Sequence, residues 1–239
     1  MRLLLTSLAL AGLIAGTAAA QTSGPAFEKA RLELRKQLDD SSAGTYPIIR
    51  RGYPDEYKAF EDELVRLFLD DAKSGVDMQT HTAQFENRIS QRLISQVKSA
   101  PDKNLVALMR SQLAAMKQLQ LAHYGACAEV GEKGAVQPAT VIFVGSGPRP
   151  AMLEFSRVSL ETGLAGKEHP TTHDQYTEAD HAKVIAAFTA HGGNEDYLGM
   201  LGADREGEVP WAMRCNQMIL YFEAILTLPE DLVARFVAR

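Results

Sequence analysis

The residues best suited to metal chemistry lie in one polar segment in the second half of the chain. This segment contains His169, His173, Asp174 and His181. Imidazole and carboxylate groups are ligands of zinc and other divalent cations, so the four residues form a candidate metal site. Their spacing is not that of His-Glu-x-x-His on one helix, and Asp180 is expected to cap the helix that follows. An exposed polar loop is the commoner structure for such a segment, and the metal site is the alternative.

A second candidate site is rich in glycine. Gly145, Gly147 and Arg149 follow the apolar run 140–144, which is predicted to be a short extended segment. A strand, a glycine turn and a helix in this order can bind an anion, and Arg149 would supply the charge. The segment lacks the Gly-Lys-Ser/Thr ending of a phosphate loop and the third glycine of a dinucleotide fingerprint. A simple turn is therefore favoured over an anion site.

The two cysteines of the chain, Cys127 and Cys215, are predicted to form a disulfide. A metal site at these thiols would need further ligands at a usual spacing, and the sequence offers none. In the chain-entropy description, closing so long a loop stabilises the fold by about 4 to 5 kcal/mol. The bond would tie the middle of the chain to its C-terminal part.

Residues 1–20 have the features of a signal peptide. Arg2 supplies a positive charge, residues 3–14 are apolar, and residues 18–20 are three alanines at the expected cleavage site. The apolar stretch is shorter than the roughly 20 residues that a membrane-spanning helix needs, and no later segment is long and uncharged enough. The sequence therefore predicts an exported, periplasmic or secreted protein without an integral membrane span, whose mature part is residues 21–239.

The charge composition argues against nucleic acid as a partner. The chain has 25 Lys and Arg against 30 Asp and Glu, a net charge of −5 at pH 7. Acidic and basic residues are interspersed along the chain, so no basic stripe is available to neutralise phosphates.

Hydrophobic periodicity predicts an all-α fold, a single helical domain of about seven or eight helices. The segment 125–138 is predicted to be irregular because of its turn-forming residues. In the last long helix, Trp211, Cys215 and Met218 fall on one apolar stripe that is expected to face the core. The expected helices are 26–38, 54–73, 78–97, 101–124, 151–162, 177–191, 211–225 and a final one from 229.

No motif in the chain identifies an enzyme, and no cofactor is predicted. The Gly-x-Ser-x-Gly nucleophile elbow and the Cys-x-x-Cys-His haem motif are both missing from the sequence. The favoured function is a non-catalytic exported protein that binds a protein partner in the cell envelope, of inhibitor, immunity, chaperone or adaptor type. The alternative is an exported metal-dependent hydrolase that uses the segment from His169 to His181. A small-ligand carrier with a cavity between helices is a third possibility, and the oligomeric state is left open.

Overall fold

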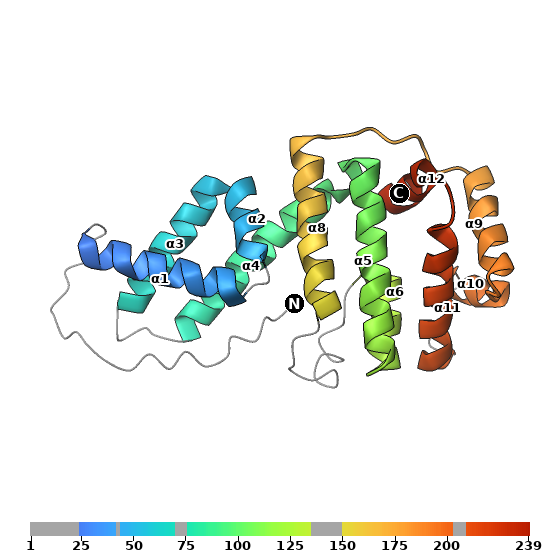
Figure 1. The fold of residues 1–239 in the computed structure, drawn as a ribbon, viewed down its shortest axis with the longest axis horizontal. Coiled ribbons are helices and arrows are strands. Elements are labelled where there is room, and N and C mark those ends of the chain that lie inside the picture. Colours follow the sequence, from blue (N-terminus) through green and yellow to red (C-terminus); the bar gives the residue numbers. More distant parts are fainter. Residues whose placement is uncertain (1–23, 42–43, 70–75, 135–149, 203–208) are drawn as a thin grey trace. The chain divides into compact units, whose positions relative to one another are not determined.

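The computed structural model describes residues 24–41, 44–69, 76–134, 150–202 and 209–239 (Figure 1). The predicted signal peptide 1–20 and the predicted extended segment 140–144 lie outside these described residues. Within the described residues, no helix combines the length and the apolar character that crossing a membrane requires.

The described residues confirm the all-α prediction, with more helices than expected. They form eleven α-helices and one short 3-10 helix, and no strand occurs among them. Three of the helices, α2, α6 and α10, were not predicted from the periodicity of the sequence. The elements are α1 (Pro25–Ser41), α2 (Thr45–Gly52), α3 (Pro54–Leu69), α4 (Val76–Gln96), η1 (Val97–Ser99), α5 (Asp102–Gln120), α6 (Tyr124–Lys133), α8 (Pro150–Glu168), α9 (Glu178–Ala190), α10 (Glu195–Gly202), α11 (Trp211–Ile225) and α12 (Glu230–Ala238).

Contacts between residues divide the chain into two compact units, here called the N-terminal unit (residues 2–92) and the C-terminal unit (residues 93–239). The N-terminal unit has an aromatic core between α2, α3 and α4. Phe60 stacks on Phe85 with ring centroids 4.0 Å apart, and Tyr46 stacks on the same Phe60 at 6.0 Å. The Tyr46 hydroxyl donates a hydrogen bond of 2.6 Å to Glu86, so this core also contains a satisfied polar pair.

An ion pair holds α1 against α3 in the N-terminal unit. The guanidinium of Arg35 donates two hydrogen bonds to the carboxylate of Glu61, at 2.6 and 2.5 Å. Glu61 is buried, and the fork of two parallel bonds is the geometry that fixes such a pair most firmly. The neighbouring carboxylate raises the pKa of Arg35 further above its usual value.

Helix α5 is the centre of the C-terminal unit. It packs against α6, α8, α11 and α12, and α11 packs in turn against α6 and α9. Figure 1 shows α5, α8 and α11 running alongside one another, with α6 next to α5. The buried side of α5 includes Leu105, Met109, Met116 and Leu119, at the three- and four-residue spacing that puts side chains on one helix face.

The position of α8 depends on two glycines. A Cβ atom on Gly163 would overlap the backbone carbonyl of Leu93, and one on Gly166 would overlap that of Gln96. Only glycine lets the two backbones approach so closely. These glycines therefore set the distance between α8 and the end of α4.

Helix α6 begins and ends at clear local signals. The Nδ1 atom of His123 accepts a hydrogen bond of 3.0 Å from the backbone N–H of Ala126, which caps the first turn. Gly134 follows the last turn with φ of 68°, the left-handed conformation that commonly ends a helix. The prediction of an irregular segment over 125–138 is thus wrong for residues 125–133.

Candidate functional site

The predicted disulfide joins α6 to α11. Cys127 and Cys215 are bonded with an S–S distance of 2.03 Å and a Cα–Cα distance of 5.4 Å, and they are 88 residues apart in the sequence. Both residues are fully buried. The disulfide prediction is confirmed, and the stripe that placed Cys215 on the core side of its helix is correct.

A buried ionic network includes Arg214, the residue before Cys215. The Nε atom of Arg214 donates a hydrogen bond of 2.9 Å to Oε1 of Glu132, and its Nη2 atom bonds the other carboxylate oxygen. The side chains of Arg214 and Glu132 are only 5% and 7% exposed. The hydroxyl of Tyr197 donates a 3.0 Å hydrogen bond to the same Oε1 atom, and burial together with this carboxylate raises the pKa of Tyr197. The network therefore connects α6, α10 and α11 around one carboxylate.

Trp211, the first residue of α11, extends from this network toward solvent. The guanidinium carbon of Arg214 lies 4.1 Å from the centroid of the indole ring, within the range of a cation–π contact. A Cβ atom on Gly125 would lie 3.5 Å from the Cδ2 atom of the indole, so the backbone of α6 borders the ring as well. Trp211 nevertheless remains 47% exposed, and the prediction that it faces the core is wrong.

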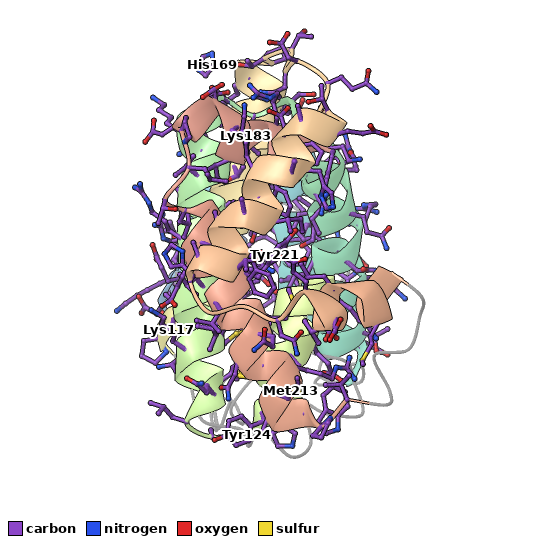
Figure 2. All side chains as sticks on the ribbon, turned by 90° about the vertical axis from the view of Figure 1, so that its right-hand side faces the viewer. Lys117, Tyr124, His169, Lys183, Met213 and Tyr221 are labelled. Carbon is purple, nitrogen blue, oxygen red and sulfur yellow. A yellow bond between two sulfur atoms is a disulfide. The ribbon has the colours of Figure 1, made fainter. Side chains whose placement is uncertain are left out.

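Four large apolar side chains are exposed at the end of the C-terminal unit where α5 ends and α6 and α11 begin. We call this group the apolar end surface. Its members are Leu121, Tyr124, Trp211 and Met213, with exposed fractions of 89%, 47%, 47% and 38%. Figure 2 shows Tyr124 and Met213 at the same end of the C-terminal unit.

A polar contact at the rim holds the end of α5 to α11. The side-chain amide of Gln120 donates a hydrogen bond of 2.7 Å to Asn216, one turn after Met213. Large apolar side chains that are exposed at one end of a folded unit are candidates for an interaction site. The apolar end surface is the strongest candidate site in the described residues.

Among the described residues, two cations near the apolar end surface are paired with carboxylates of the protein itself. Arg214 is paired with Glu132, and Lys117 on α5 forms a salt bridge of 2.6 Å with Glu223 on α11. These two cations therefore offer little attraction to an anionic partner.

The four residues of the predicted metal site lie in different surroundings. His169 is exposed just beyond the end of α8, and Asp174 is exposed in the loop that follows. His181 is exposed on α9, with its ring against Tyr176 at a centroid distance of 6.4 Å. Across the described residues, no three His, Cys, Asp or Glu side chains are grouped so that they could hold a metal ion.

His173 has a structural role in this segment. Its Nε2 atom lies 2.9 Å from the backbone carbonyl oxygen of Ala100, and its Nδ1 atom lies 3.2 Å from the carboxylate of Asp102. The backbone N–H of Thr171 also donates a hydrogen bond of 2.8 Å to Ser99. These contacts fasten the loop to the start of α5.

The predicted anion site, Gly145, Gly147 and Arg149, lies outside the described residues. It stays a prediction.

Comparisons with known proteins identify no relative. No protein-family model matches this chain, and no curated protein and no solved structure matches it either.

Most of the apolar end surface was missed by reasoning from the sequence. The sequence predicts that Trp211 and Tyr124 belong to helices, and it predicts neither of them as an exposed site. The available signal was the short distance in sequence between Leu121 and Tyr124, two large apolar residues where one helix ends and the next begins.

Proposed function

We propose that this protein is an exported, non-catalytic helical protein that binds a protein partner in the cell envelope through the apolar end surface. The observation that supports the proposal is the exposure of four large apolar side chains on a framework fixed by a disulfide and a buried ionic network. A rigid framework lowers the entropy that is lost on binding, so more of the contact energy appears as affinity. Aromatic anchors such as Trp and Tyr are also the residues that contribute most to binding at protein interfaces.

The chemistry of the surface favours a protein partner over nucleic acid or an anionic membrane. The net charge of −5 repels phosphate groups at long range. The cations beside the surface, Lys117 and Arg214, are each paired with a carboxylate of the protein itself. The expected partner therefore offers an apolar, uncharged contact area.

Site-specific photo-cross-linking in the native host tests this proposal. A benzophenone amino acid at Leu121 should give a cross-link to another protein, and the cross-link should disappear when Trp211→Asp is added. The matched control is the same probe at Leu32, a leucine of α1 that is 62% exposed in the N-terminal unit. The probe at Leu32 should give no such product.

Other results of this experiment would contradict the proposal. Cross-links only to lipid would make the surface a membrane contact, and cross-links only to a second copy of the chain would make it a self-association surface. No cross-link at Leu121, or equal products at Leu121 and Leu32, would remove the surface from consideration.

Export can be tested separately on protein purified from the same host. Cleavage after Ala20 should leave Gln21 as the first residue, and mass spectrometry of the intact protein detects this directly. An intact leader on the purified protein would contradict export.

A further inference from the structure

We propose that Arg214 is the positioning residue of the apolar end surface: held by Glu132, its guanidinium fixes the indole of Trp211 in the orientation that meets the partner. This inference rests on the proposed function, because it explains how the binding surface is kept ready. It assigns a role to a buried charge pair that the stability of the helix bundle alone does not require, since apolar side chains often fill such a place equally well.

The geometry around Arg214 leaves its guanidinium little freedom. Two of its nitrogens bond the two carboxylate oxygens of Glu132, which sets both the position and the plane of the group. With the side chain only 5% exposed, the guanidinium cannot turn out into water. Its carbon lies 4.1 Å from the centroid of the Trp211 ring, so a fixed cation sits against the indole.

The carboxylate that holds Arg214 is itself held. Glu132 is on α6 and also accepts the hydrogen bond from Tyr197 on α10. Cys215, the residue after Arg214, is bonded to Cys127 on α6, so the two helices that carry Glu132 and Arg214 are covalently linked beside the pair. The orientation of the indole therefore depends on a continuous chain of contacts from α6 and α10 to Trp211.

The start of α6 also borders the ring. A Cβ atom on Gly125 would be in ordinary van der Waals contact with the indole. A Cβ atom here would lie 2.9 Å from Cε1 of His123, the residue that caps α6, and 3.5 Å from the indole itself. The ring is thus positioned by a guanidinium and by the backbone of α6, while nearly half of the residue remains open to a partner.

The fluorescence of Trp211 measures this positioning directly, because it is the single tryptophan in the chain. We would compare the anisotropy decay and the acrylamide quenching of the purified protein with those of the double variant Arg214→Met/Glu132→Met. Replacing both charges avoids an unpaired buried carboxylate. The Tyr197 hydroxyl loses its acceptor, a cost smaller than the usual stability of a folded domain, so the double variant should still fold. The fast, local part of the anisotropy decay and the quenching constant should each rise about twofold as the ring is released.

A matched control and a conservative variant separate positioning from a loss of stability. Arg35→Met/Glu61→Met removes a similar ion pair in the N-terminal unit and should leave both fluorescence measurements unchanged. Arg214→Lys keeps the charge but cannot form the two parallel bonds to Glu132, so its anisotropy should fall between that of the wild type and that of the double variant. Wild-type fluorescence in Arg214→Met/Glu132→Met, or an equal change in the control pair, would overturn the inference.

These measurements are made on the free protein, so the inference and the proposed function can fail independently. Mobile indole in the double variant without any cross-linked partner would retain the positioning role and reject partner binding. A cross-linked partner whose yield is the same in wild type and in the double variant would retain the function and reject the role of Arg214.

Discussion

Removing the disulfide between Cys127 and Cys215 should lower the free energy of unfolding by several kcal/mol. The appropriate change is the double variant Cys127→Ala/Cys215→Ala, because a single substitution leaves a reactive thiol. The bond links residues 88 positions apart. In the chain-entropy description, a loop of this length restricts the unfolded state by about 4.6 kcal/mol at 25 °C. Both sulfurs are fully buried, so lost packing adds to this value.

Urea unfolding followed by far-UV circular dichroism measures the loss. Total stabilities of about 5–15 kcal/mol are usual, so the variant should keep its helices without urea but unfold at a much lower concentration. Its dependence on urea should also become steeper, because the unlinked chain exposes more surface when it unfolds. Ile225→Val, which trims a fully buried side chain on the same helix, serves as a scale and should cost about 0.5–1.5 kcal/mol. A loss in the double variant no larger than that of Ile225→Val, with an unchanged urea dependence, would refute the reasoning.

Three further predictions concern packing, acid stability and metal binding. Gly166→Ala should destabilise the protein by about 1–3 kcal/mol in urea unfolding, because its Cβ would overlap the carbonyl of Gln96. Gly199→Ala is the control, because a Cβ there meets nothing within 4 Å. This control should stabilise the protein by about 0.5–1 kcal/mol. Hydrogen bonds from Arg235, and then those from the capping box, lower the pKa of Asp180 to about 2. The ionised carboxylate therefore stabilises the fold fully above its ordinary pKa of 3.8. This contribution to stability is lost as the pH falls from 3.8 toward 2. Asp180→Asn should therefore flatten the fall in melting temperature over that pH range, and an equally steep fall would contradict the assignment. Zinc in excess should leave the melting temperature unchanged, because the histidines of the polar segment do not share a site in the structure; a rise that grows with zinc concentration would show binding.

Helices with a regular apolar stripe could be predicted from the sequence, whereas α6 could not. Its segment contains several small residues, which by themselves are typical of turns. In the structure, a Cβ atom on Gly131 would lie 2.8 Å from Cε of Met116 and 2.9 Å from Cβ of Met218. The glycine is therefore needed for close packing inside a helix, and only the neighbouring helices reveal this requirement.

The two candidate sites show different limits of sequence reasoning. The disulfide could be predicted because a chain with two cysteines and a predicted export signal has one simple pairing. The histidine-rich segment looked like a site because its residues are close in sequence, but His169 follows α8 and His181 lies on α9, so the chain directs them to different surroundings. Nearness in sequence therefore does not by itself bring side chains together in space.

Hydrophobic periodicity predicts on which side of its helix a residue lies, but not how far the neighbouring helices extend. The apolar end surface could therefore not be predicted from it. Trp211 has the same phase as Cys215, which is fully buried one turn later. It is the first residue of its helix, however, and α5 has ended at Gln120 and α6 begins only at Tyr124. The covering helices therefore end beside Trp211, and the ring stays partly in solvent.

The bond between Cys127 and Cys215 also makes residues 127–215 a closed covalent ring. A protease that cuts one peptide bond inside this ring opens it without releasing a fragment, since both pieces remain attached through sulfur. Outside the cell, where proteases are common and thiol reductants are scarce, such a nicked molecule would keep its mass on a non-reducing gel and divide in two only after reduction. The helices between the cysteines can therefore survive a single cut as parts of one molecule.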